Sequence, residues 1–228
     1  MRVLALIPAR GQSKRVPGKN KRALGGKPLI CWSIQCIQEI EAVCDVLVST
    51  DDPEIAAIAT GAGASVPWMR PSDLATDTAT SVDVALHALN WYEQENGVVD
   101  GLLLLQPTSP FRTRDTIQRG LEIFRLGNFR PVVAVSPAHP HPMWCVRIED
   151  DNLVPFMTPN GFTMRSQELP PVYAVNGVLY LIAPHDLRHE HSFAIEGAAP
   201  IIIDSAKEAL DIDTEHDWRC AVAYLSSQ

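Results

Sequence analysis

Short continuous apolar runs alternate with stretches of helical spacing along most of this chain. The apolar runs predict strands that are buried on both faces, and they cover residues 3–8, 45–50, 101–105 and 131–136, with a shorter one at 65–68. The stretches between them place apolar side chains three and four residues apart and predict helices over residues 28–40, 52–60, about 80–89 and 114–126. This β-α-β alternation predicts an α/β fold, in which a mostly parallel, Rossmann-like sheet is the middle layer of a three-layer αβα sandwich.

The alternation stops after Ser136. Residues 137–180 are rich in proline, contain a hairpin-like pattern over residues 146–155 and show no long helical stretch. The earlier pattern resumes with strands at 178–182 and 201–203 and a helix that begins near Thr214.

Two structural parts follow from this break in the pattern. We expect residues 1–136 and 181–228 to form one α/β domain, because strand and helix alternate in both segments. We expect residues 137–180 to project from that domain as a small β-rich insertion.

Composition narrows the class of protein without changing this fold. A length of 228 residues suits one domain with a modest insertion, and 46% hydrophobic residues are enough to bury a core. The chain contains no apolar run near the roughly 20 residues that a membrane span needs. Its five cysteines are odd in number and lack CxxC pairs, which favours reduced thiols and a cytoplasmic location.

Charge is distributed unevenly along the chain. The net charge is -8, yet all eight charged residues before Glu39 are basic, so residues 1–38 carry +8. Residues 39–228 hold the other 11 basic residues and all 27 acidic ones, which gives -16. A general nucleic-acid binder usually has a more extensive basic face, so we expect a local polyanion site and no nucleic-acid partner. The alternative is a solvated basic loop without a function.

The basic segment lies in a loop directly after the first predicted strand. Arg10, Lys14 and Lys19 could neutralise a triphosphate, and Gly11 and Gly18 would let the backbone approach it closely. Ligands of open parallel sheets bind beyond the carboxyl ends of the strands, where this loop begins. The segment therefore predicts a phosphate site.

Two known phosphate motifs do not describe this loop. The P-loop has four residues between its glycines and a Ser or Thr after its lysine, whereas six residues separate Gly11 from Gly18 here and Asn20 follows Lys19. The dinucleotide fingerprint G-x-G-x-x-G is also absent from the sequence. We expect phosphate binding with a different geometry.

Two aspartates near the other end of the chain predict a metal site. Asp211 and Asp213 alternate with Leu210 and Ile212, so an extended backbone would present both carboxylates on one side. Hard oxygen ligands beside a phosphate site suit Mg²⁺, with Mn²⁺ as the other candidate. The alternative is that Asp213 only caps the last helix.

Two further segments place polar residues at expected ligand positions. Residues 106–112 follow the apolar strand at 101–105, where active-site side chains of such sheets gather, although a simple Pro-rich turn would also fit. Residues 70–81 are rich in hydroxyl groups and lead into a helix start, whose free N–H groups favour polar or anionic ligands.

Together these segments resemble the acylneuraminate cytidylyltransferases, also called CMP-sialic acid synthetases, over nearly the whole chain. Five motifs carry the resemblance, in order: Ala9-Arg10-x-x-Ser13-Lys14-x-x-Pro17-x-Lys19-Asn20, Arg70-Pro71-x-x-Leu74-Ala75-x-Asp77-Thr78, Leu105-Gln106-Pro107-Thr108-Ser109-Pro110-x-Arg112-Thr113, Asn176-Gly177-x-x-Tyr180 and Asp211-Ile212-Asp213-Thr214. The resemblance implies a nucleotide-diphospho-sugar transferase type of fold and a nucleotidyl transfer. The anomeric hydroxyl of an N-acylneuraminate or related nonulosonic acid would attack the α-phosphate of CTP, giving the CMP-sugar and pyrophosphate.

The resemblance also implies roles for individual residues. The catalytic set would be Arg10, Lys19, Gln106 and Asp211. Nucleotide binding would fall to Arg10, Lys14, Lys19, Asn20, Arg70, Ala79 and Ser81. The sugar acid would meet Gln106, Arg165, Asn176 and Tyr180, and the metal would be held by Asp211 and Asp213. Asp211 and a metal-bound water are the two candidates for the proton acceptor.

Members of this family are typically homodimers in which the insertion reaches over the partner's active site. The resemblance therefore implies a homodimer in which Arg165 and Tyr180 serve the neighbouring subunit.

The sugar region departs from the best-known sialate enzymes. Ala174-Val175 stand where those enzymes carry Arg-Pro, and Met143-Trp144 stand where a basic residue follows a His-Pro step. Loss of two cations there makes a related nonulosonate, such as a diacetylated legionaminic acid, a candidate acceptor. Two alternatives remain: a CMP-Kdo synthetase with an eight-carbon acceptor, and a CTP-binding protein without catalysis.

Overall fold

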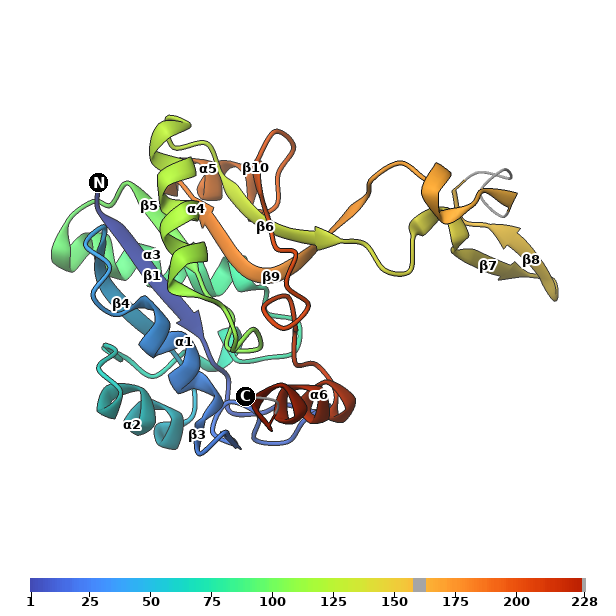
Figure 1. The fold of residues 1–228 in the computed structure, drawn as a ribbon. Helices are drawn as coiled ribbons and strands as arrows, with labels where there is room; N and C mark the ends of the chain where they lie inside the picture. Colours follow the sequence, from blue (N-terminus) through green and yellow to red (C-terminus); the bar gives the residue numbers. More distant parts are fainter. Residues whose placement is uncertain (158–162, 227–228) are drawn as a thin grey trace.

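A mixed sheet forms the centre of the molecule. The computed structural model describes residues 1–157 and 163–226, and within them the central sheet has six strands in the order β10–β6–β9–β5–β1–β4 (Figure 1). The strands are β1 (Val3–Pro8), β4 (Val43–Ser49), β5 (Gly101–Leu104), β6 (Val132–Pro137), β9 (Tyr173–Ile182) and β10 (Ala199–Ile202). β1 pairs in parallel with β4 and β5, and β10 pairs in parallel with β6, whereas β9 runs antiparallel between β5 and β6.

Helices cover both faces of this sheet. One face packs against α1 (Leu29–Ile37), α2 (Pro53–Gly61) and α4 (Arg114–Leu126), and the other against α3 (Ser81–Asn96) and α5 (Pro184–Glu190). β1 shows why a continuous apolar run was needed: Val3, Ala5 and Ile7 belong to the first core, and Leu4 and Leu6 to the second. The predicted three-layer α/β/α fold is confirmed.

A third, smaller core lies beside the sheet. It joins α6 (Glu215–Ser226) to the basic loop, because Trp218 and Ala221 of α6 pack with Val16 and Leu24. Leu24 belongs to a short hairpin of β2 (Ala23–Leu24) and β3 (Lys27–Pro28), within the segment predicted as a plain loop. The last helix therefore supports the basic loop.

The structure also differs from the predicted elements in β9, in α5 and at residues 65–68. β9 begins at Tyr173, so the expected end of the insertion at residue 180 falls inside a strand of the central sheet. α5 was not predicted, because its seven residues are too few to show an apolar period. Only Ser65 of the strand expected at 65–68 pairs, through one bridge to Leu47.

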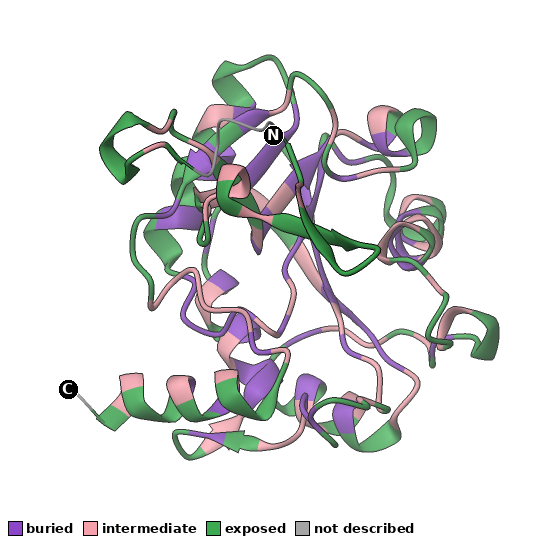
Figure 2. Cartoon of the chain, turned by 90° about the vertical axis from the view of Figure 1, so that its right-hand side faces the viewer, coloured by how far each residue is buried: buried purple, intermediate pink, exposed green. Residues whose placement is uncertain are grey.

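An arm projects from the sheet between β6 and β9. Here the arm means the described residues from 138 to 172; it holds the short helical turns η2 (Pro142–Trp144) and η4 (Ser166–Glu168) and a hairpin of β7 (Val146–Glu149) and β8 (Asn152–Pro155). The hairpin lies at the residues that predicted it, and its turn is made by Asp150 and Asp151 with φ of 49° and 62°. Figure 1 shows the arm standing away from the layers, and Figure 2 shows the hairpin almost entirely exposed.

No helix formed by the described residues is both long and apolar enough to cross a membrane.

Candidate active site

A cleft lies beyond the carboxyl ends of β1, β4 and β5. Its cavity has a volume of about 580 Å³, and its walls come from the basic loop, residues 70–84, the turn after β5 and the segment before α6. Ten of the predicted site residues line it: Arg10, Lys14, Lys19, Asn20, Arg70, Ala79, Ser81, Gln106, Asp211 and Asp213. The cleft thus joins four of the five sequence motifs.

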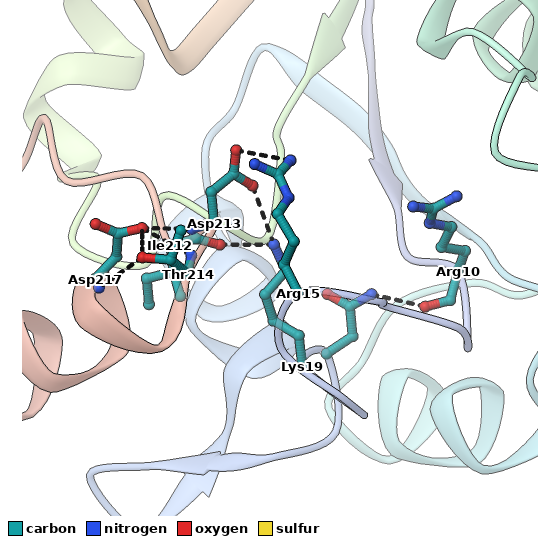
Figure 3. A network of polar contacts seen from close by, with 8 residues as sticks. Arg10, Arg15, Lys19, Ile212, Asp213, Thr214 and Asp217 are labelled. Atoms are coloured by element: carbon teal, nitrogen blue, oxygen red, sulfur yellow. Dashed lines mark hydrogen bonds and ion pairs between the residues drawn. The ribbon is translucent and has the colours of Figure 1, made fainter.

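The basic loop is held in shape by its own polar contacts. Asn20 donates from Nδ2 to the carbonyl oxygen of Arg10 over 2.9 Å, which closes the loop on itself (Figure 3). The N–H of Gly11 donates to Asp51 Oδ1 over 2.8 Å. A Cβ at Gly11 would lie 2.7 Å from Cβ of Asp52, so only glycine allows this close approach to the turn after β4.

Lys19 joins the two ends of the chain at the cleft. Its Nζ donates to the carbonyl oxygen of Ile212 over 2.6 Å and lies 3.5 Å from Asp213 Oδ1 (Figure 3). Arg15 Nη2 lies 3.1 Å from the other oxygen of Asp213. Burial lowers the pKa of the Lys19 ammonium, and the charges of Asp213 and Asp211 oppose that shift. The predicted convergence of the basic loop and the aspartate pair is present.

Asp211 is half-buried, and one of its two carboxylate oxygens is fully buried. Its Oδ1 is buried and has no hydrogen-bond partner among the described residues. Burial raises the pKa of the Asp211 carboxyl; a hydrogen bond from Thr108 opposes that shift, and the charge of Asp213 adds to it. Ile212 between the two aspartates is fully buried, as the predicted alternation requires.

Asp213 does not cap the last helix. The side chains of Thr214 and Asp217 form the cap: Asp217 N donates to Thr214 Oγ1 over 3.3 Å, and Thr214 N donates to Asp217 Oδ2 over 2.8 Å (Figure 3). Asp213 contributes only its backbone N–H to Asp217. Its carboxylate is therefore directed to Arg15 and Lys19, and the capping alternative is wrong.

Arg70 forms part of the cleft wall. It is only 7% exposed, and it donates from Nε to Ser49 Oγ over 3.0 Å and from Nη2 to the carbonyl oxygen of the same residue. Burial lowers the pKa of its guanidinium to about 10. This anchoring at the end of β4 fixes the wall that leads to Ala79 and Ser81.

Asp77 lies on the same wall and faces the basic loop. Its Oδ1 accepts a hydrogen bond from Arg10 Nη1 over 2.8 Å, and its Oδ2 pairs with Lys14 Nζ. Asp77 belongs to the second sequence motif, but the sequence analysis assigned no role to it. A one-dimensional pattern cannot show a pair across 67 residues, and only the density of polar residues in 70–81 pointed to this segment.

Gln106 faces a glycine of β9. A Cβ at Gly177 would lie 2.7 Å from Gln106 Oε1, and this glycine has φ of 74°. The neighbouring Asn176 accepts from Val178 N through Oδ1, and its Nδ2 is buried without a partner among the described residues. Gln106 and the Asn176-Gly177 pair are thus brought together.

Arg112 is a second residue whose place the sequence did not reveal. It is buried and donates to the carbonyl oxygens of Gln106, over 2.9 Å, and Val178, and to Ser33 Oγ over 3.0 Å. It therefore ties the turn after β5 to β9. Burial lowers the pKa of this guanidinium.

Three predicted sugar-acid residues lie outside the cleft lining: Tyr180, Arg165 and Asn176, the last of which adjoins the contact of Gly177 with Gln106. Tyr180 is a residue of β9 in the central sheet, packed against Phe193 with ring centroids 5.8 Å apart, and burial raises its pKa. Arg165 is exposed on the arm, where its backbone N–H donates to Glu168. Within one copy of the chain, Arg165 is not brought to Gln106.

Comparison with known proteins identifies close relatives. A family model described as cytidylyltransferase matches residues 4–125. The chain is 41% identical to the CMP-N,N'-diacetyllegionaminic acid synthase of Legionella pneumophila, covering 96% of this chain and 94% of that protein. It is 32% identical to an N-acylneuraminate cytidylyltransferase of Streptococcus agalactiae, covering 99% of this chain and 54% of that protein.

A solved structure shares the fold. The CMP:2-keto-3-deoxy-manno-octonic acid synthetase complexed with CTP superposes with a TM-score of 0.75 over 100% of this chain and 99% of that one, at 16% sequence identity.

Proposed function

The chain belongs to the cytidylyltransferase family, and we propose that it transfers CMP from CTP to the anomeric hydroxyl of a nonulosonic acid. The observation that carries this proposal is the cleft in which Lys19 of the basic loop lies beside Asp213, with Gln106 in the same lining. The hydroxyl oxygen forms a bond to the α-phosphorus and loses its proton to the Asp211 carboxylate or to water. The bond from that phosphorus to the bridging oxygen of the β-phosphate breaks, and pyrophosphate leaves with the electron pair.

The cations of the cleft suit the nucleotide. CTP and a sugar acid are both anionic, so the barrier includes their repulsion and the charge that develops on pyrophosphate. Arg10, Lys14 and Lys19 line one cavity and are placed to offset both terms. Arg70, Ala79 and Ser81 form the opposite wall, where we place the cytidine.

The aspartate pair fits a divalent cation. Asp211 offers a buried oxygen that has no hydrogen-bond partner within residues 1–157 and 163–226, and Asp213 also belongs to the lining, so both are suited to hold Mg²⁺ or Mn²⁺. When bound, the metal would neutralise phosphate charge as a Lewis acid. Lys19 would keep Asp213 in place from the other side, because its ammonium already contacts that carboxylate.

A diacetylated legionaminic acid is the acceptor that we favour. The relative with 41% identity is named as a CMP-N,N'-diacetyllegionaminic acid synthase, so its name gives this acid as the acceptor. In this chain Ala174 and Val175 of β9 precede Asn176, and Trp144 lies in η2 of the arm, so neither position carries a cation. Neutral acyl groups need no cation, whereas the corresponding positions of the best-known sialate enzymes are basic.

The arm supports a homodimer. It exposes a set of large apolar side chains within the described chain: Trp144, Val146, Ile148, Leu153, Phe156 and Met157. Since Arg165 is on the same arm and outside its own cleft, we propose that a second copy covers this surface and receives Arg165 near its sugar-acid site. We place the enzyme in the cytoplasm, where its five free thiols would stay reduced.

Pyrophosphate release tests the activity. The full chain is incubated with Mg²⁺, CTP and one acceptor: N,N'-diacetyllegionaminic acid, N-acetylneuraminic acid or the eight-carbon acid Kdo. We expect release only when all three components are present, and fastest with the first acceptor. Pyrophosphate release with Kdo, but with neither of the two nonulosonic acids, would support the eight-carbon alternative. Binding of CTP without pyrophosphate release for any of the three acceptors would support a non-catalytic protein.

A further inference from the structure

Asp77 is a charged residue of the cleft that the proposed reaction does not use. It lies in the loop between η1 (Ser72–Leu74) and α3, on the wall opposite the basic loop. The two cations that it contacts, Arg10 and Lys14, are two of the three that we assign to the triphosphate. In the free protein, therefore, one carboxylate holds the groups that the phosphates need.

The remaining cations of the cleft have other partners. Arg15 and Lys19 contact Asp213, and Arg70 is bound to Ser49. Arg10 and Lys14 thus depend on Asp77 for their ion pairs among the described residues. The pairing is strong enough to lower the pKa of the Asp77 carboxyl, through Lys14 first and then Arg10.

Asp77 is also free to leave these cations. Its side chain is 50% exposed, and that of Lys14 is 77% exposed, so neither is enclosed by packing. The local loop bonds are made by Thr76, whose Oγ1 accepts from Ala79 N over 3.2 Å, and not by the Asp77 side chain. The carboxylate can therefore turn into solvent without breaking the loop.

A carboxylate and a phosphate compete for the same cations. Arg10 Nη1 and Lys14 Nζ are oriented toward Asp77, and an entering triphosphate would also meet the negative charge of Asp77 at close range. Building on the function proposed above, we propose that Asp77 is an internal counterion of the nucleotide site: it positions Arg10 and Lys14 in the free protein and is displaced from them by the triphosphate.

This exchange lowers affinity for the nucleotide and helps pyrophosphate to leave. Each exposed ion pair that must break costs a fraction of the gain from the new phosphate contacts. After the transfer, Asp77 can form its ion pairs with Arg10 and Lys14 again as pyrophosphate dissociates. Removal of this carboxylate should therefore strengthen polyphosphate binding, which is the opposite of what damage to the loop would do.

The test is a calorimetric titration of the full-length chain at low salt and without divalent metal. The probes are inorganic tripolyphosphate, which carries the phosphate charges without a base, and CTP. We expect Asp77→Asn to bind tripolyphosphate roughly fivefold more tightly than the wild type, from the release of two exposed ion pairs. Asp77→Glu keeps the carboxylate and should stay within about twofold of the wild type.

Asp73→Asn is the matched control. Asp73 is exposed four residues before Asp77, outside the cleft lining, and makes no ion pair in the described part of the chain, so this change removes the same charge without breaking an ion pair. An Asp77→Asn affinity equal to that of Asp73→Asn, or weaker than wild type, would overturn the proposal. If CTP binds every variant while tripolyphosphate affinity stays constant, the counterion role fails alone. If tripolyphosphate responds as expected but no variant binds CTP, the proposed function fails and the counterion role stands.

Discussion

Among single residues, Asp211 combines burial with an unsatisfied oxygen. Its Oδ1 has no partner among the described residues, and such a group costs folding free energy unless a ligand meets it. The same oxygen is the one best suited to a metal. The unpaired carboxylate oxygen of Asp211 therefore lowers the stability of the fold but is needed for the proposed catalysis.

Asp211→Asn separates these two effects. We expect turnover to fall by roughly 10² or more, because a neutral amide is a poor metal ligand and cannot offset phosphate charge. The melting temperature measured in EDTA should be equal to or above that of the wild type, since a buried charge is removed. Added Mg²⁺ should raise the melting temperature of the wild type and leave that of the variant unchanged. A variant that keeps its turnover would remove Asp211 from the site.

Gly177→Ala tests the contact between β9 and Gln106. The new Cβ would lie 2.7 Å from Gln106 Oε1, the end of a flexible side chain, so the chain should fold with Gln106 displaced. We expect the KM for the acceptor to rise about tenfold, the equivalent of about 1.4 kcal/mol, with CTP affinity unchanged. Steady-state kinetics with each substrate varied in turn provide the measurement.

Gly26→Ala is the control for backbone strain. Gly26 has φ of 84° and nothing within 4 Å of its Cβ position, so it shares the strained backbone but not the contact. Its acceptor KM should match that of the wild type. Equal KM values for the two variants would mean that strain, and not Gln106, explains the effect.

Some site residues could be predicted from the sequence and others could not. Lys19, Gln106 and Asp211 follow predicted strands or precede a predicted helix, and the topology of parallel sheets brings such positions together. Arg112 contacts Val178, which is 66 positions away in the sequence, and Asp77 contacts Lys14, which is 63 positions away. No local spacing in the sequence encodes contacts over such distances. Their roles appear only when the chain is folded.

At the scale of elements, the start of α3 fixes one wall of the cleft. Thr80 Oγ1 accepts from Asp83 N over 3.1 Å, and Asp83 Oδ2 accepts from Thr80 N and Oγ1, over 3.1 and 2.7 Å. Thr80 and Asp83 thus form a capping box, a variant of the usual pattern with Asp in place of Glu or Gln. It sets the position of Ser81, the first residue of the helix.

Asp83→Asn should weaken this helix start in a pH-dependent way. Hydrogen bonds from the Thr80 hydroxyl and backbone lower the pKa of the Asp83 carboxyl below its ordinary 3.8. The carboxylate therefore stabilises the fold above about pH 4, and this contribution is lost as the pH falls through the lowered pKa. Urea unfolding should show a loss of about 1 kcal/mol at pH 7 that shrinks toward pH 3. The control is Asp115→Asn, in the first turn of α4, which should lose less free energy of unfolding at pH 7. If the loss caused by Asp83→Asn were the same at pH 3 and pH 7, the capping role would be contradicted.

Most helices and strands could be predicted from the spacing of their apolar residues. The first half of β9 and the helix α5 could not, because their positions depend on tertiary packing. β1 and α4 have the bounds that their patterns predict. The first half of β9 carries exposed and half-buried residues, because it leaves the layered core and runs toward the arm, so its sequence lacks the continuous apolar run. α5 is a single short helix held by Leu187 against the sheet, which is too little to create a period.

For the whole molecule, the arm is where the proposed dimer can be tested. Ile148 and Leu153 are opposite each other in the hairpin and are 75% and 67% exposed. Large apolar side chains gathered on a projecting element mark a surface for another protein. One copy alone leaves them in solvent.

Ile148→Asp and Leu153→Asp, made separately, should each convert a dimer into a monomer. A charge that must be buried at an interface opposes association. Light scattering after size exclusion gives the mass of each species. Val98→Asp is the control, because Val98 is 76% exposed and belongs to the segment between α3 and β5, which lies away from the arm in Figure 1. This variant should remain a dimer. A monomeric wild type, or dimeric hairpin variants, would contradict the proposed assembly.

The contact between Lys19 and Asp213 spans 194 positions and has a consequence for biosynthesis. A ribosome makes the basic loop 194 positions before its acidic counterpart Asp213. Throughout that interval the nascent chain displays eight positive charges on residues 1–38 without Asp213 or Glu215 to balance them. The cleft can thus be completed only after Asp213 has been made, and until then residues 1–38 are the segment most attracted to ribosomal RNA.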